Sequence, residues 1–341
     1  MWMNGDVEAL HGAWADSLRD AWAGGPEAVA WSPGWERTVR DVRVVVAGTP
    51  VRVWDGFAYA GVPWSLFPHV FGPGEEVAED VGRLRRADAP TALSVIRRLW
   101  GRVCHAGQPS TSRALAVPFL LRIAADPSTH HRSEVLWLAG GLARRVHDHG
   151  FGRGDLLRVG YADDEWAFAA CGYLQNWTIE AVRGAITADA GIVTALLDDP
   201  DADARCLAAY VLAASSGEIG AITAALRVRL RVEDGTRARA CLVLAIAQLA
   251  REHADESVPA WMRTRWSDPR QPPEVRVGAA LGWLCLVDDP APATLRATLE
   301  DCVTPELAHE LGSVPWLVEM GPDGDALLHT LRRLLEPTPR L

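Results

Sequence analysis

"DGTRARACLVLAIAQLA", residues 234–250, joins a polar lead and an arginine to a run of small and aliphatic residues. The same order recurs in DADARCLAAYVLA at 201–213 and in PPEVRVGAALGWLCLV at 272–287. The aligned arginines are Arg205, Arg239 and Arg276. A fixed period in the range of about 20–50 residues is typical of repeat proteins. We therefore expect each segment to be one helix of a repeating unit.

A second helical pattern precedes each of these segments and ends in a helix breaker. Asp-Pro recurs at 126–127, 199–200, 268–269 and 289–290. Proline ends a helix because it lacks an N–H and disfavours helix at the preceding residue. The pattern predicts helix–turn–helix units of about 35–45 residues. The predicted fold is all-α, a right-handed α-solenoid of helix pairs over residues 61–341.

Residues 1–60 have a different pattern. The stretch 6–24 predicts an amphipathic helix, and a tryptophan-rich loop follows it. RTVRDVRVVVAGTPVRVWDGFAYAG, residues 37–61, alternates apolar and polar residues on both sides of AGTP, which favours a β-hairpin. We expect these residues to form a small mixed α/β cap on the array, or alternatively a separate binding module.

The charge balance bears on the choice of partner. The 341 residues carry 34 basic and 44 acidic side chains, a net charge of −10, and every basic residue is arginine. No basic stripe that would bind phosphates is visible, so we expect no nucleic-acid partner and favour a basic protein. No 18-residue apolar span or signal-like leader is present, so we expect no membrane partner and a cytoplasmic location.

Three stretches resemble a known family: WSLFPHVFGPGEEVAEDVGRL at 64–84, LWGRVCHAG at 99–107 and STSRALAVPFLLRIAADP at 110–127. They are similar to HEAT-repeat proteins that are widespread in actinobacteria. The matching residues are Trp64, His69, Gly72, Leu99, Trp100, Gly101, His105, Gly107 and Ala116–Leu120. This chain has Ala106 where the family usually has glutamine. The resemblance implies an α-solenoid that serves as an interaction scaffold, in some cases as a proposed immunity protein beside a toxin gene, and it implies no catalytic residues.

The cysteines have no predicted chemistry. Cys104 and His105 are adjacent, and adjacent residues on a helix point about 100° apart, so they would not form a catalytic dyad. We expect Cys104 to pack as a small apolar residue and His105 to end a helix. Cys171, Cys206 and Cys241 recur with the repeat. Because neighbouring helices lie about 8–10 Å apart, we expect separate buried thiols and neither a zinc site nor a disulfide.

The histidines give no stronger signal. His147 and His149 flank Asp148, but residues two apart on a helix face nearly opposite sides. His130 and His131 precede a helix in a turn, and His309-Glu310 is a single dipeptide where di-iron HEAT-repeat hydroxylases use several. We therefore predict no metal, no cofactor and no catalytic residue.

The best candidate for a binding surface is GYADDEWAFAACGYLQNW, residues 160–177. Acidic residues beside aromatic residues are typical of interfaces for basic partners. The predicted contact residues are Asp163, Asp164, Glu165, Trp166, Trp177 and His105.

The predicted function is non-catalytic protein binding along the concave face of the array, for example as an immunity or regulatory protein. An enzyme or enzyme accessory with a small ligand between the N-terminal module and the repeats is the alternative. A HEAT-like DNA glycosylase is a minor one. The sequence leaves the oligomeric state open.

Overall fold

A computed structural model describes residues 29–30, 38–39, 41–69, 71–105, 108–145, 152–161, 175–318 and 326–335. Over these residues the chain is helical, which confirms the predicted all-α class. The first helices are α2 (Val42–Gly48), α3 (Val51–Asp55), α4 (Glu75–Leu84), α5 (Ala89–Val103), α6 (Ser112–Ala125) and α7 (Arg132–Leu142). The central ones are α8 (Gln175–Ala188), α9 (Ala190–Ala195), α10 (Ala202–Leu212), α11 (Ile219–Val232) and α12 (Thr236–Glu252). The last are α13 (Val258–Ser267), α14 (Pro273–Leu286), α15 (Ala293–Cys302), α16 (Pro305–Gly312), α17 (Pro315–Val318) and α18 (Ala326–Leu335).

Short elements connect these helices. Three 3-10 turns are η1 (Tyr59–Gly61), η2 (Trp64–Leu66) and η3 (Leu196–Asp198). Four described strands have two residues each. Strand β1 (Val29–Ala30) pairs antiparallel with β2 (Thr38–Val39), and β3 (Cys104–His105) pairs antiparallel with β4 (Gln108–Pro109).

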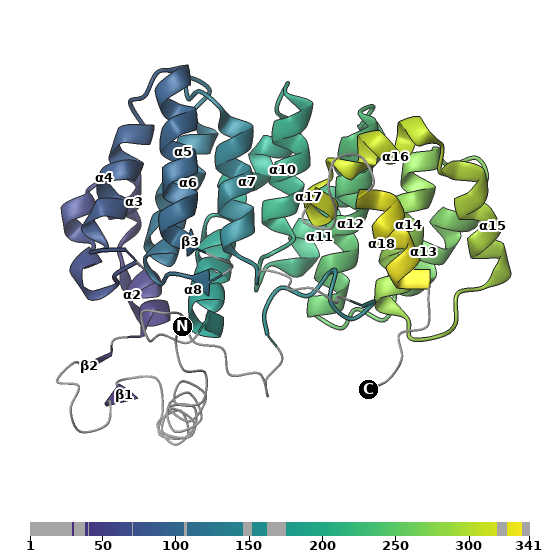
Figure 1. Ribbon diagram of the computed structural model, residues 1–341, viewed down its shortest axis with the longest axis horizontal. Helices are drawn as coiled ribbons and strands as arrows, with labels where there is room; N and C mark the ends of the chain where they lie inside the picture. The colour runs from purple at the N-terminus through teal and green to yellow at the C-terminus, as the bar shows by residue number, and fades with distance from the viewer. Residues whose placement is uncertain are drawn as a thin grey trace, which may run out of the picture.

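The helices lie side by side along the long axis of the molecule (Figure 1). Helices α7, α10, α12 and α14 each pack on the next and form a central row. Helix α6 packs on α7, α11 on α12 and α13 on α14, so the helices are paired as the sequence pattern predicts. Helices α16, α17 and α18 pack on one another, with α16 also contacting α12 and α18 contacting α14.

Small residues set the spacing within the central row. A Cβ on Gly140 of α7 would lie 2.5 Å from the Tyr210 ring of α10, and a Cβ on Gly282 of α14 would lie 2.8 Å from Ala247 of α12. Neither position has room for a side chain. The glycines therefore allow the helix backbones to approach closely.

An arginine lies at or near the start of each helix of the central row, and we call Arg132, Arg205, Arg239 and Arg276 the arginine ladder. Each guanidinium donates a hydrogen bond to a main-chain carbonyl at the end of the helix that comes before the arginine's own helix in the chain. The acceptors are the carbonyls of Ala124, Asp199, Glu233 and Trp266, at 2.8, 2.9, 2.7 and 3.2 Å. The last carbonyls of a helix lack partners within the helix, and cations are favoured there. The ladder therefore caps the C-terminal end of the helix that precedes each central-row helix.

The same guanidinium groups also reach the following unit. Arg132 donates to the Asp199 carboxylate at 2.6 Å, and Arg239 donates to the Glu274 carboxylate at 2.8 Å. Arg205 contacts Glu233 with two nitrogens, at 2.8 and 2.7 Å. Each contact joins side chains from successive helix pairs, so these arginines connect neighbouring pairs along the central row.

Glu233 accepts the densest set of donors in the ladder. Burial would raise the pKa of its carboxyl group, but hydrogen bonds from Arg205, the Gly235 N–H and Arg229 outweigh burial and hold the pKa at about 2. Because this pKa is below the unfolded value, the carboxylate stabilises the fold fully above about pH 4.5 and loses that contribution as the pH falls toward 2.

The predicted hairpin around AGTP is wrong, because residues 42–48 and 51–55 form α2 and α3. The Asp41 carboxylate accepts the Arg43 N–H and caps α2, and Val42 and Val46, four residues apart, are both buried. Burial of one helical face therefore outweighs the strand preference of a valine-rich segment. The β1–β2 pairing precedes this segment, and the predicted helix at 6–24 lies outside the described residues.

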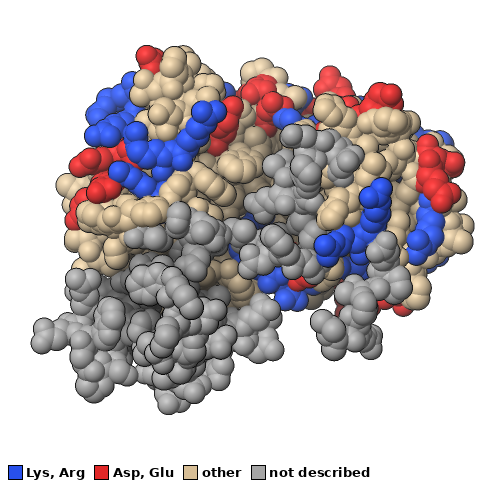
Figure 2. All heavy atoms as spheres, in the orientation of Figure 1, with Lys and Arg blue, Asp and Glu red and all other residues tan. Residues whose placement is uncertain are grey.

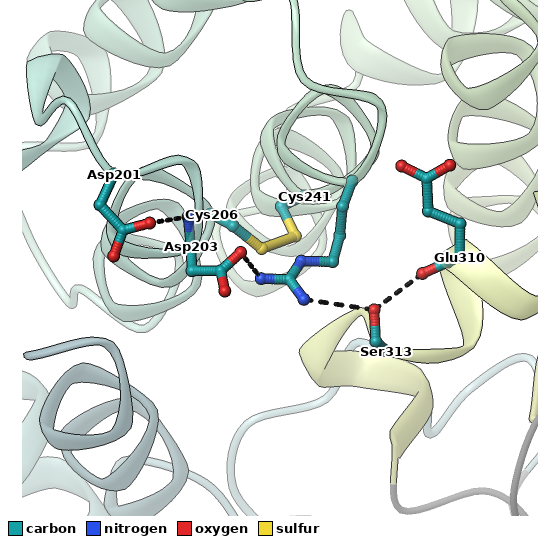
Figure 3. Close-up of a disulfide and its surroundings, with 7 residues drawn as sticks. Asp201, Asp203, Cys206, Cys241, Glu310 and Ser313 are labelled. Carbon is teal, nitrogen blue, oxygen red and sulfur yellow. Dashed lines mark hydrogen bonds and ion pairs between the residues drawn. A yellow bond between two sulfur atoms is a disulfide. The ribbon is translucent and has the colours of Figure 1, made fainter. Parts of the chain in front are cut away.

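The structure also corrects the prediction of separate thiols, because Cys206 of α10 and Cys241 of α12 form a disulfide (Figure 3). Their Cα atoms are 5.5 Å apart. The distance between helix axes misled the prediction, since side chains that face each other across two closely packed helices are nearer than the axes. Cys171 lies outside the described residues.

Replacing Arg205 by methionine should lower the free energy of unfolding by about 3 kcal/mol, because Glu233 would remain buried without its bidentate partner. Urea unfolding measures the loss. The control is Arg270→Met, which removes a largely exposed guanidinium paired with Asp268 and should change the stability by less than about 0.5 kcal/mol. Equal effects of the two substitutions would contradict the role of the ladder.

In protein that is unfolded without reductant, Cys206 and Cys241 should resist alkylation and appear as one cross-linked peptide pair by mass spectrometry. Reduction should make both reactive. The matched control is Cys285, which is a free thiol in the structure and should be alkylated in both samples. Alkylation of Cys206 before reduction would disprove the disulfide.

Candidate functional site

The predicted contact residues have different outcomes. Asp163, Asp164, Glu165 and Trp166 lie outside the described residues, as do His147 and His149. Trp177 lies in α8 and is only 3% exposed, with the Arg43 guanidinium 4.6 Å from its ring centroid. The structure thus makes Trp177 a core residue with no surface to offer a partner.

The Cys104-His105 stretch lies in the segment that connects two helices. Helix α5 ends at Val103, buried Cys104 follows as its C-cap, and α6 begins at Ser112. The main chain of His105 lies in β3, paired with Gln108 of β4.

A different set of side chains forms a pocket of about 200 Å³ on the edge where α7, α10 and α12 begin. We call it the edge pocket. Its far wall comes from the residues around the start of α17. The residues that line it include Glu134, Trp137, Asp203, Arg237, Ser313 and Pro315.

Carboxylates dominate this edge. The side chains of Glu134 and Asp203 are 44% and 55% exposed. Asp201, Glu306 and Glu310 are exposed nearby, and Figure 2 shows acidic side chains along the same upper edge, interleaved with arginines. Arg237 pairs with Asp203 and donates to the Ser313 hydroxyl at 3.4 Å (Figure 3). The ion pair fixes the floor of the pocket and leaves Glu134 and Glu310 facing solvent.

Trp137 lines the edge pocket, and Trp100 packs against it toward the end of α7. The rings of Trp100 in α5 and Trp137 in α7 lie 4.8 Å apart between centroids, and both side chains are half-buried. A Cβ at Gly141 would lie 3.2 Å from Trp100, so the glycine makes room for the pair. Rigid aromatic side chains with one exposed face are typical anchors of protein interfaces.

The wall of the edge pocket is held by a buried polar contact. Trp316 of α17 donates its indole N–H to Gln248 of α12 at 2.5 Å, and its ring packs edge-on against Tyr210 of α10, 4.9 Å between centroids. The Arg144 guanidinium lies 3.6 Å from the centroid of the Tyr210 ring and donates to Gln248. This cluster joins the C-terminal helices to the central row, so the pocket is preformed.

A larger pocket of about 540 Å³ lies at the end of α12, beside residues of α13 and α14. Its lining includes Arg251 and Glu252, which already serve the fold. Arg251 donates to the Cys285 carbonyl, and Glu252 accepts the Val159 N–H and pairs with Arg183. This pocket does not combine an apolar lining with converging catalytic groups, the arrangement that the enzyme alternative requires.

The residues that the structure describes show neither a metal site nor a membrane span. Among them, no cluster of three histidine, cysteine or acidic side chains could hold a metal ion. No described helix combines the length and the apolar character that crossing a membrane requires.

Comparison of the chain with models of protein families, with curated proteins and with solved structures found no match. The candidate site therefore rests on geometry and charge alone.

Replacing Trp316 by alanine should loosen the wall of the edge pocket, because Gln248 and the Tyr210 ring lose their partner. Amide hydrogen exchange in residues 305–318 should rise at least tenfold, and the protein should lose about 3–5 kcal/mol of stability. The control, Trp261→Ala, removes a half-buried ring of α13 and should leave exchange in 305–318 unchanged. Unchanged exchange in the Trp316 variant would show that the indole does not hold this segment.

Proposed function

We propose that this chain is a non-catalytic scaffold of the HEAT type, a right-handed α-solenoid, that binds a basic protein partner at the edge pocket. The paired helices and the recurring arginine ladder support the solenoid, because each unit repeats the same helix end and the same link to its neighbour. The resemblance of residues 64–127 to actinobacterial HEAT-repeat proteins agrees with it.

The observation that carries the binding proposal is the meeting of carboxylates and aromatic rings on one exposed edge. Glu134 and Glu310 supply negative charge, Asp203 shares its charge with Arg237, and the Trp100–Trp137 pair supplies rigid apolar surface. A basic partner would approach under electrostatic attraction and anchor on the rings. The site lies on a different part of the chain from the predicted acidic segment at 163–166.

The immunity-protein version of this function is one concrete form of the proposal. It predicts that the partner is a basic protein encoded beside this chain. A cytoplasmic location stays a prediction, and the Cys206–Cys241 disulfide weighs against it because such bonds persist chiefly in oxidising compartments.

The test is affinity capture from the native host with the triple variant Glu134→Gln, Asp203→Asn, Glu310→Gln. A matched control, Glu75→Gln, Glu79→Gln, Glu300→Gln, removes three exposed acids from α4 and α15. We expect the wild type and the control to recover the same basic protein, and the edge variant to recover at least tenfold less of it. Binding should also weaken at 0.5 M salt.

Urea unfolding of the three proteins shows whether the edge variant retains its fold. Recovery of the same partner by a folded edge variant would contradict the proposed site. Recovery of acidic or neutral partners alone would contradict the proposed partner.

A further inference from the structure

A buried arginine at the opposite edge of the molecule has no role in the proposed scaffold. Arg113 is the second residue of α6, is 1% exposed and is among the largest fully buried side chains. Burial lowers the pKa of its guanidinium to about 10, so it keeps its proton at neutral pH. A full positive charge therefore lies in the core.

No described group neutralises this charge. Among the residues that the structure describes, no carboxylate pairs with Arg113, and its buried Nε and Nη2 atoms have no hydrogen-bond partner. Arg144 is buried to a similar degree but donates to the carbonyls of Gly140 and Tyr210 and to Gln248. An uncompensated buried ion is strongly unfavourable, and native proteins rarely keep one without a function.

The surroundings of Arg113 are polar. Ser110, Thr111 and Ser112 directly precede it and are fully buried, with the Ser110 and Ser112 hydroxyl oxygens 2.9 Å apart. The titratable groups that act on its guanidinium are the Cys104 thiol and the Tyr161 hydroxyl.

Several elements meet at this place. Cys104 ends α5, Ser112 begins α6, and Gln175, the first residue of α8, accepts the Tyr161 hydroxyl at 2.5 Å. Helix α8 packs on α6 and contacts β4, and β3 and α8 lie together at the lower edge in Figure 1. The start of α6 adds the positive end of a 14-residue helix dipole. The charge and the donors there suit an anion.

We propose that Arg113 binds the carboxylate of a small monoanionic ligand at the junction of α5, α6 and α8. A guanidinium presents parallel N–H donors that match a carboxylate in a bidentate pair. The single positive charge that the described residues leave unpaired balances one carboxylate, whereas a phosphate dianion would leave negative charge in the core. The nearby Arg145 cannot add a charge, because it pairs with Asp155 at 2.7 Å. A side chain that is 1% exposed also has no surface for a macromolecule.

This site and the edge pocket lie on opposite edges of the helices, so disproof of one proposal would leave the other unaffected. A carboxylate could come from a free small molecule or from an acidic residue of this chain, and the experiment separates the two sources.

The test measures the thermal midpoint of the full-length protein with acetate, butyrate, benzoate or phenylacetate, each at 10 mM and constant ionic strength. Chloride and inorganic phosphate serve as reference anions. We expect at least one carboxylate to raise the midpoint of the wild type by about 2 °C or more, without an equal effect of phosphate. Arg113→Met should lose that shift, and Arg270→Met, at an exposed arginine, should keep it.

Arg113→Lys serves as a second variant, because it retains the charge if the methionine variant fails to fold. It should bind the same carboxylate at least tenfold more weakly, since an ammonium group lacks the paired donors. An equal shift in wild type and Arg113→Lys, no shift with any carboxylate, or a shift with phosphate alone would overturn the proposal.

A second set of variants tests whether an acidic residue of this chain supplies the carboxylate that pairs with Arg113. If Asp163→Asn, Asp164→Asn, Glu165→Gln lowers the stability of the wild type but not that of Arg113→Met, the partner of Arg113 is a carboxylate of this chain and the ligand proposal is wrong. Equal effects in both backgrounds would support the free ligand.

Discussion

The structure depends on an arginine near the start of each helix in the central row. In a pair of consecutive helices, the carbonyls at the end of the first helix lack hydrogen-bond partners within that helix. The pair must also be joined to the next pair. In Arg205 and Arg239 one guanidinium does both, because it donates to a helix-end carbonyl and to a carboxylate of the following unit. The planar group with its five donors suits this double role in a way that lysine would not.

Close packing and the ladder act on the same interface. Gly140 and Gly282 bring the central helices together, and the Cys206–Cys241 disulfide spans α10 and α12 just behind the ladder residues. The C-terminal helices then dock through Trp316 and Gln248 on the face of that row. The edge pocket is a consequence of this docking, since its two walls come from parts of the chain that the repeat alone would not bring together.

The all-α class was predictable from sequence, because the aligned arginines and the Asp-Pro breakers mark helices and their ends locally. The hairpin prediction failed since a valine-rich segment such as 42–46 fits a strand or a buried helical face equally well until its partners are known. The candidate site was less predictable. Trp137 and Asp203 are far apart in sequence and meet only through packing, and Arg113 has the same local pattern as a ladder arginine but no carboxylate partner among the described residues.

The most direct test of the central claim is a double-mutant cycle between Arg239 and Glu274, which lie 2.8 Å apart in successive units. Urea unfolding of the wild type, Arg239→Met, Glu274→Gln and the double variant measures the coupling free energy between the two side chains. If the ladder joins the units, the coupling should be at least about 1.5 kcal/mol. A coupling near zero would show that the units are held together by apolar packing alone.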